Sequence, residues 1–218
     1  MKGLFITFEG PDGAGKSTQL KNLAEFLKEQ RVPFIMTREP GGTEIGNSIR
    51  SILLNPANAT LVQKTEVLLY AASRAQHVQE TIVPSLENGK IVLCDRFVDA
   101  SIAYQGYGLE LSVDEVIAIN RFAVGGIEPD RTYLIDLPPT EGRQRMMNRQ
   151  DTNESYELDR IEQKHLTYHQ RVREGFHRIY EENNHRMCLI DGNRDIEDVF
   201  QDILNDFKNY YKKIKGVV

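Results

Sequence analysis

The stretch LFITFEGPDGAGKST, residues 4–18, decides the fold. It opens with an apolar, β-branched run, which is typical of a buried strand. It continues into a glycine-rich segment that fits G-x-x-x-x-G-K-[ST] at residues 10–17, and leucine or alanine then recurs with helical spacing at 20, 23, 24 and 27. A glycine-rich turn between a strand and a helix is the arrangement that wraps backbone N–H groups around phosphates. The stretch therefore predicts a phosphate-binding loop.

The residue types in this loop match what a nucleoside triphosphate requires. Glycines let the backbone approach the phosphates at φ angles that a Cβ atom would disfavour. Lys16 would place a positive charge at the β- and γ-phosphates, and the Ser17 hydroxyl would ligate Mg²⁺. The predicted ATP-binding residues are Gly10, Pro11, Asp12, Gly13, Ala14, Gly15, Lys16, Ser17 and Thr18.

Short apolar runs alternate with longer helical patterns along the rest of the chain. We predict strands at Leu4–Phe8, Pro33–Thr37, Ile91–Asp95, Thr132–Asp136 and Met187–Asp191. Apolar stripes predict helices through residues 20–27, 71–86 (ended by Gly89) and 158–179, and the polar stretch 150–156 is predicted to be a mobile loop. Alternation of strands with helices predicts right-handed crossovers and an α/β fold, with a parallel sheet between helical layers. We expect one domain over residues 1–218.

Composition and charge narrow the class of partner. The 218 residues are 40% apolar and 27% charged, as in an ordinary globular protein, and the net charge of −5 disfavours polymeric nucleic acid as the main partner. No apolar run approaches the ~18 residues of a membrane helix, and the N-terminus lacks a secretory pattern, so we expect a cytoplasmic protein with no membrane partner. Cys94 and Cys188 lie in apolar runs and are predicted to be buried free thiols.

Charged residues at the ends of the predicted strands point to a second anionic ligand. Ligands of doubly wound sheets bind beyond the carboxyl ends of the strands. Arg38 follows the second predicted strand and Arg96 the third, while Asp95 ends the third strand, where related proteins hold Mg²⁺. Guanidinium groups match phosphate oxygens bidentately. The sequence therefore predicts a second phosphorylated ligand beside the nucleoside triphosphate.

Six segments together resemble the thymidylate kinase family, in that family's order and spacing. They are FEGPDGAGKST (8–18), TREPGGT (37–43), LYAASR (69–74), CDRF (94–97), AYQG (103–106) and LDRIE (158–162). The resemblance implies a three-layer P-loop NTPase fold with a five-stranded parallel sheet and a short lid at about residues 143–157. It also implies a homodimer that transfers the γ-phosphoryl group of MgATP to dTMP, giving dTDP on the route to dTTP.

The resemblance also implies roles for individual residues. Arg38, Arg50 and Arg96 would hold the acceptor phosphate, and Tyr70 and Arg74 would stack on and hydrogen-bond to the thymine. Tyr70 and Arg74 are four residues apart and so share a helix face. The implied substrate-binding residues are Glu39, Pro40, Arg50, Tyr70, Arg74, Arg96, Ser101, Tyr104 and Gln105, with Tyr104 crowding the sugar 2′ position. The implied metal ligands are Ser17 and Asp95.

Members of this family take a catalytic arginine either from the phosphate loop or from the lid. Ala14 occupies the loop position and carries no charge, whereas Arg143, Arg145 and Arg149 precede the polar stretch 150–156. We favour Arg149 as the lid arginine. The implied catalytic residues are Lys16, Arg149, Asp12, Arg38 and Arg96, with Asp12 near the acceptor sugar or the metal.

Other functions stay open at this stage. The nearest alternative is another P-loop kinase that acts on a different nucleotide or on a nucleoside. A GTPase-like switch would need a guanine-reading N-K-x-D element, which the sequence lacks. A nucleic-acid-dependent ATPase is disfavoured by the acidic balance.

Overall fold

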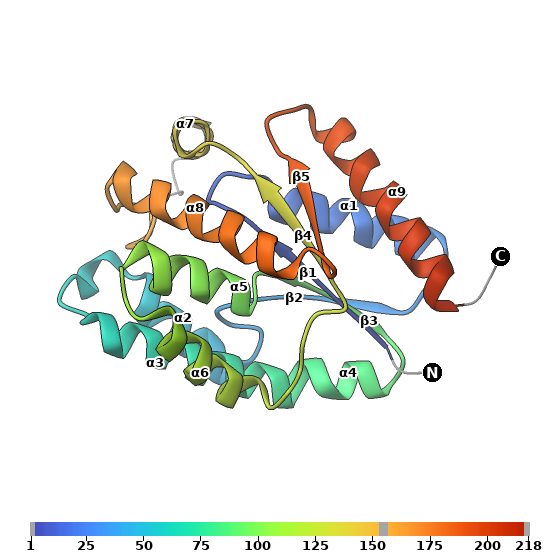
Figure 1. Ribbon diagram of the computed structural model, residues 1–218, viewed down its shortest axis with the longest axis horizontal. Coiled ribbons are helices and arrows are strands. Elements are labelled where there is room, and N and C mark those ends of the chain that lie inside the picture. Colours follow the sequence, from blue (N-terminus) through green and yellow to red (C-terminus); the bar gives the residue numbers. More distant parts are fainter. Residues whose placement is uncertain (1–2, 153–156, 216–218) are drawn as a thin grey trace.

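The computed structural model describes the backbone of residues 3–152 and 157–215 and the side chains of residues 3–148 and 157–214. Within these residues a five-stranded sheet forms the centre (Figure 1). Its strands are β1 (Leu4–Glu9), β2 (Phe34–Arg38), β3 (Ile91–Asp95), β4 (Arg131–Asp136) and β5 (Met187–Asp191). Their order is β2-β3-β1-β4-β5 and every pairing is parallel. The predicted fold class is confirmed, and each predicted strand lies within one residue of its observed limits.

Helices cover both faces of the sheet, which explains the continuous apolar runs of its strands. In β1, Ile6 and Phe8 pack with α1 (Lys16–Glu29) and α9 (Ile196–Lys215), whereas Phe5 packs in a separate cluster on the opposite face. Successive strand side chains point to opposite faces. Burial on both faces therefore selects apolar residues at nearly every position.

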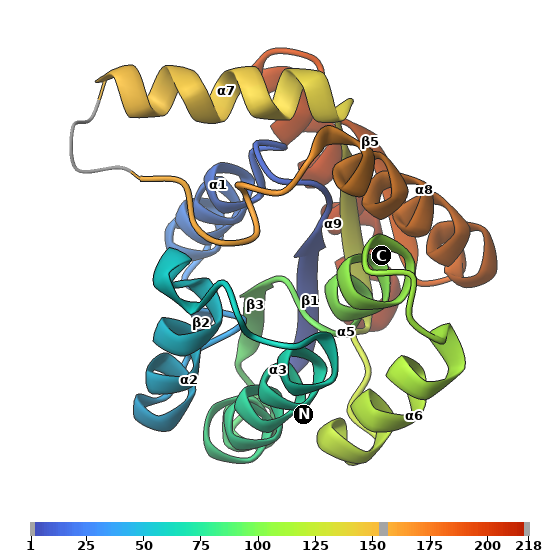
Figure 2. The same cartoon turned by 90° about the vertical axis from the view of Figure 1, so that its left-hand side faces the viewer.

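The remaining helices lie on the opposite face and around the carboxyl edge of the sheet. They are α2 (Glu44–Leu54), α3 (Gln63–His77), α4 (Val83–Glu87), α5 (Val98–Ser101), α6 (Val113–Val124), α7 (Pro139–Thr152) and α8 (Leu166–Asn183). Figure 2 shows α7 at the top of the molecule and α2, α3 and α6 at the bottom. No helix in the described part of the chain has both the length and the apolar character needed to cross a bilayer.

The predicted helix through residues 71–86 begins before its apolar stripe, at Gln63, and contains a π-helical turn. Between α3 and α4 the backbone forms the π-helical segment η2 (Val78–Ile82), in which the Val83 N–H donates to the carbonyl five residues earlier. Pro84 has no N–H to give to the preceding turn, and a π-turn is one way for a helix to accommodate such a gap. The helix ends before Gly89, which has a φ of 72°, as predicted.

The predicted helix 158–179 is wrong in its first two turns, since α8 begins only at Leu166. The Asp159 carboxylate accepts from the backbone N–H groups of Ile161 (2.8 Å) and Glu162 (2.9 Å), and such a local bond competes with helix formation. Of the predicted mobile loop, residues 150–152 belong to α7 instead, and residues 153–156 lie outside the described part of the chain.

Candidate active site

The glycine-rich loop folds tightly between β1 and α1. Gly13 and Gly15 adopt φ angles of 80° and 91°, which only glycine takes without strain. Lys16 begins α1 and is 7% exposed, and its Nζ donates to the Pro11 carbonyl at 2.7 Å. Burial, followed by the nearby charge of Arg96, lowers the pKa of Lys16 to about 8. The acidic groups near Lys16 therefore do not fully offset the cost of burying its positive charge in this loop.

Two side chains that carry oxygen lie in contact at the edge of this loop. The Ser17 hydroxyl, in the first turn of α1, donates to the Asp95 carboxylate at the end of β3. Both residues line the same cavity. Mg²⁺ prefers oxygen ligands and commonly takes one or two from the protein, with water and phosphate oxygens completing its shell. The donor set at Ser17 and Asp95 fits Mg²⁺.

A cavity of about 750 Å³ opens beyond the carboxyl ends of the strands and contains most of the predicted site. The predicted residues that line it are Asp12, Gly13, Gly15, Lys16, Ser17, Thr18, Arg38, Glu39, Pro40, Arg50, Tyr70, Arg74, Asp95, Arg96, Ser101, Tyr104 and Gln105. Three predicted residues do not: the Gly10 and Pro11 carbonyls bind Arg96 and Lys16, and Ala14 packs in the core. Arg149 lies in α7, but its side chain is outside the described part of the chain.

Arg96 is fixed beside the phosphate loop at a φ of 69°. It pairs with the Asp12 carboxylate, donates to the Gly10 carbonyl at 3.0 Å, and lies over the Tyr104 ring at 4.7 Å. The Tyr104 hydroxyl in turn donates to Asp12 at 2.8 Å. Burial opposes ionisation of Asp12, yet the charges of Arg96 and Lys16 outweigh it and lower the pKa of that carboxyl. Asp12 is therefore ionised and orients Arg96.

Two further arginines face Arg96 across the cavity. Arg38 is exposed at the end of β2, and Arg50 of α2 donates to the Pro40 carbonyl at 2.9 Å. Burial, then repulsion from Arg38 and Arg96, lowers the pKa of Arg50. Like charges gathered in one cavity favour an anionic ligand, and the spacing of guanidinium groups suits phosphate oxygens.

Arg74 is almost fully buried, with 2% of its surface exposed. Its Nε donates to Glu39 at 2.6 Å, Nη1 donates to Ser101 (3.0 Å) and Asn120, and Nη2 donates to the Phe97 carbonyl at 3.0 Å. A guanidinium has five N–H bonds. The described protein groups therefore use four of them, and Arg74 still lines the cavity.

Gln105 presents a hydrogen-bond acceptor near Arg74. Glu66 is an acceptor only, because its carboxylate pairs with Arg160 at 2.6 Å. The amide nitrogen of Gln105 must therefore be the atom that faces Glu66, at 3.2 Å. The Gln105 Oε1 is buried and has no hydrogen-bond partner among the described residues.

The base of α7 lies directly on the phosphate loop. A Cβ atom at Gly13 would lie 2.5 Å from the Gly142 carbonyl, so the two backbones touch. Arg145 donates to the Gly192 carbonyl at 3.0 Å and to Gly13 at 3.5 Å, whereas Arg143 lines a small recess beside Asp12. Arg145 is thus held by backbone carbonyls on both sides.

Sequence reasoning missed a polar stripe on α3. Glu66, Ser73 and His77 share the face of Tyr70 and Arg74, since they recur at spacings of three, four and seven residues. Glu66, Ser73 and His77 are buried, and no histidine had been given a role. The helical spacing of these polar residues with Tyr70 and Arg74 is the signal that could have identified them.

Comparisons with known proteins agree on one family. A family model described as Thymidylate kinase matches residues 8–203. The thymidylate kinase of Exiguobacterium sibiricum is 53% identical over 98% of both chains, and that of Bacillus velezensis is 45% identical over 99% of this chain and all of the relative. The crystal structure of thymidylate kinase from Ehrlichia chaffeensis has a TM-score of 0.74 and 34% identity, covering 95% of this chain and 99% of that one.

Proposed function

The chain belongs to the thymidylate kinase family, which phosphorylates dTMP to dTDP with ATP, and from that premise we propose which residues perform each part of the transfer. One observation carries the proposal: Lys16 and the guanidinium groups of Arg38, Arg50 and Arg96 line a single cavity. Phosphoryl transfer mainly requires positioning and neutralisation of charge, and one cavity with two cationic sides provides both.

On the donor side, the phosphate loop and Lys16 hold the β- and γ-phosphates of ATP. The buried Lys16 gains a matching anion there, which favours its charged form. Ser17 and Asp95 would hold Mg²⁺, and the ion, when bound, neutralises charge on those phosphates. This proposal includes the prediction from the sequence that residues 10–18 surround the phosphates of ATP. Thr18 follows Ser17 in the first turn of α1.

On the acceptor side, Arg38, Arg50 and Arg96 orient the phosphate of dTMP for direct in-line attack. Asp12 and Tyr104 hold Arg96 in place through the contacts described above. The acceptor phosphate is already ionised near neutral pH, so this side of the cavity need not remove a proton from it. No covalent enzyme intermediate is required.

The base is read by a fixed donor and a fixed acceptor. The unused N–H of Arg74 suits a pyrimidine carbonyl oxygen, and the unpaired Oε1 of Gln105 suits a ring N–H. Thymine and uracil offer this pair, whereas cytosine carries an amino group and an unprotonated ring nitrogen at the same edge. Because both groups are buried, a mismatched base would leave them unsatisfied. Tyr70, Ser101, Glu39 and Pro40 complete this side of the cavity.

An acceptor screen tests the proposal. Turnover with ATP is measured for dTMP, UMP, CMP, AMP and thymidine, and dTMP should be the best acceptor. Gln105→Leu should lower kcat/KM for dTMP by about tenfold or more, because the base N–H loses its acceptor. Gln201→Leu, at an exposed position of α9, is the matched control and should behave as wild type. A preference for thymidine or for a purine nucleotide would contradict the assignment.

The lid and the single domain also belong to the proposal. We assign the lid to α7 and the segment that follows it, at about residues 143–157, within one kinase domain over residues 1–218. Arg149 is then the lid arginine that approaches the transferred group, an assignment favoured by the commitment of Arg145 to the Gly192 and Gly13 carbonyls. The expected cytoplasmic location stays a prediction.

We further assign a homodimer interface to the outer face of α3 and α6. Phe122 of α6 is 92% exposed, and Leu68 of α3, the helix packed against α6, is also exposed. A large aromatic side chain in water favours a partner surface. Light scattering after size exclusion should give a dimer for the wild type and a monomer for Phe122→Asp. A monomeric wild type would contradict this assignment.

A further inference from the structure

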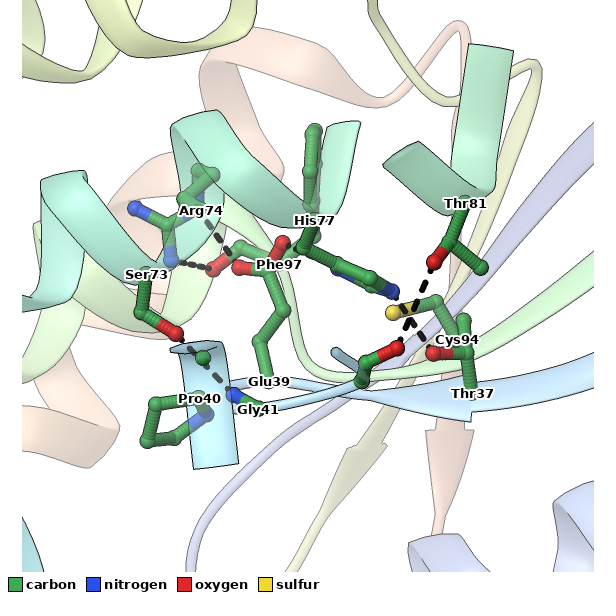
Figure 3. A network of polar contacts seen from close by, with 12 residues as sticks. Thr37, Glu39, Pro40, Gly41, Ser73, Arg74, His77, Thr81, Cys94 and Phe97 are labelled. Carbon is green, nitrogen blue, oxygen red and sulfur yellow. Dashed lines mark hydrogen bonds and ion pairs between the residues drawn. The ribbon is translucent and has the colours of Figure 1, made fainter. Parts of the chain in front are cut away.

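We propose that His77 is a positioning residue for the acceptor phosphate: it holds both neighbours of Arg38 and thereby aims that guanidinium into the cavity. The proposal rests on the assigned role of Arg38 as a phosphate ligand. His77 ends α3 and is completely buried. Its Nε2 lies 2.6 Å from the Thr37 hydroxyl, and its Nδ1 lies 2.9 Å from a Glu39 carboxylate oxygen (Figure 3). One imidazole thus contacts the residues on either side of Arg38.

The alternation of side chains explains why this arrangement aims Arg38. Along an extended backbone, successive side chains point to opposite sides. With the side chains of Thr37 and Glu39 both fixed to α3, Arg38 must point the other way. Arg38 lines the cavity, whereas His77 does not. His77 can therefore act on the substrate only through the residues it holds.

The position of β2 makes this support necessary. In the described sheet β2 is an edge strand, paired only with β3, and it is the strand without any fully buried residue. Beyond the strand, the Glu39 N–H still donates to the Asp95 carbonyl at 2.9 Å. The other edge of β2 has no neighbouring strand in the described sheet, so the contacts of His77 with Thr37 and Glu39 add a restraint that a second strand would otherwise supply.

Residues of α3 and of the π-helical segment that follows it also hold the turn after Arg38. Ser73 accepts from the Gly41 N–H at 3.1 Å, and Thr81 donates to the Gly42 carbonyl at 3.3 Å. A Cβ atom at Gly42 would lie 2.5 Å from the imidazole of His77, so the ring packs directly against that backbone. The turn is held at several points by one rigid helix.

The network also reaches the second phosphate arginine. The other carboxylate oxygen of Glu39 accepts from Arg74, which donates to the carbonyl of Phe97, the residue after Arg96 (Figure 3). The glutamate carboxylate accepts, so Nδ1 of His77 carries the hydrogen that it donates to Glu39, and Nε2 contacts the Thr37 hydroxyl. Both ring nitrogens are needed to hold both neighbours of Arg38.

Steady-state kinetics of four variants test the proposal: Thr37→Val, His77→Phe, Arg38→Ala and the double variant Thr37→Val/Arg38→Ala. Thr37→Val removes one of the two bonds without changing the shape of the side chain, and should raise KM for dTMP about fivefold. His77→Phe removes both and should raise it about tenfold or more, with KM for ATP within about twofold of wild type. In the Arg38→Ala background, Thr37→Val should change KM for dTMP little further, because the Thr37 hydroxyl contacts His77 and not the Glu39–Arg74 pair, so its effect passes through Arg38.

Thr7→Val is the matched control. Thr7 is as buried as His77 and makes a hydroxyl bond of 2.8 Å to Thr132, away from the cavity. The variant Thr7→Val should lower the melting temperature about as much as Thr37→Val does, but it should leave KM for dTMP unchanged. If Thr37→Val and His77→Phe lower only the melting temperature, or if the effects of Thr37→Val and Arg38→Ala on KM for dTMP add in full, the positioning role is refuted.

The outcomes separate this proposal from the assigned function. An unchanged KM for dTMP in Arg38→Ala would overturn the assigned role of Arg38 itself. An increased KM in Arg38→Ala with a normal KM in Thr37→Val would overturn only the role of His77. If His77→Phe does not fold, Thr37→Val and its control decide the question alone.

Discussion

Glu9 sits at the end of β1 with its side chain completely buried below the phosphate loop. One carboxyl oxygen accepts from the Phe97 N–H at 2.7 Å, and the other has no partner among the described residues. Burial, reinforced by the charge of Asp99, raises the pKa of Glu9 to about 8, although Arg96, the Phe97 N–H and Lys16 oppose the shift. At neutral pH Glu9 is therefore mostly protonated. A neutral carboxyl here adds no negative charge beneath the ATP phosphates.

Replacing Glu9 by glutamine keeps the shape and the acceptor for Phe97 but removes the titration. The ordinary pKa of this carboxyl is 4.5, so between that pH and about 8 the folded protein holds a proton that the unfolded chain has released. The wild type must then lose stability as pH rises through this window, at about 1.4 kcal/mol per pH unit. From about pH 5 to about pH 7.5 the loss relative to Glu9→Gln should total about 3 kcal/mol.

Urea unfolding followed by circular dichroism, at half-unit pH steps, measures both proteins. Groups that the two proteins share largely cancel in the difference between their free energies of unfolding, which isolates Glu9. The difference should grow steadily in favour of Glu9→Gln as pH rises. Two curves that run parallel from pH 5 to pH 7.5 would refute the protonated, buried state of Glu9.

Three further substitutions probe the site. Lys16→Ala should abolish turnover while the far-ultraviolet circular dichroism stays that of the wild type, because the donor phosphates lose their buried cation; near-normal turnover would contradict this. Arg149→Ala should lower kcat by about a hundredfold or more with little change in KM for dTMP, as expected for a group that acts on the transition state, and Arg143→Ala is its comparison; a larger effect on KM than on kcat would make Arg149 a binding residue. Tyr104→Ala should lower kcat with dTMP, since Arg96 loses support, and should raise the relative kcat/KM for a 2′-hydroxyl acceptor. An unchanged deoxy-to-ribo ratio would remove Tyr104 from sugar selection.

The strands and the phosphate loop were predictable because both depend on local pattern. A strand buried on both faces is a short apolar run, and the loop requires glycine at fixed spacing. The ends of helices were less predictable, as Asp159 illustrates. Its side chain binds the N–H groups of the next residues and delays α8, although the apolar stripe continues through that segment.

The interior of the site was predicted only in part. The cavity gathers Arg38, Arg50 and Arg96 as the sequence indicated, but Arg74 is far more engaged with the protein than a base-reading residue needs to be. Its partners Glu39 and Asn120 are 35 and 46 residues away in sequence, and no helical period reports such contacts. The helical spacing of His77 with Tyr70 and Arg74 could have placed it on the face toward the site, but that spacing does not report its partners Thr37 and Glu39.

The contact between Gly13 and Gly142 fixes the N-terminal part of α7 against the phosphate loop, so α7 could tilt about this point. Both residues lack a side chain, which lets the two backbones touch, and a methyl group at either position would force them apart. From Gly142 to Arg149 the helix rises about 10 Å, so a tilt of about 20° would carry the far end about 4 Å while the near end stays in place. The largest displacement of α7 would then fall at the end of the helix to which we assigned Arg149.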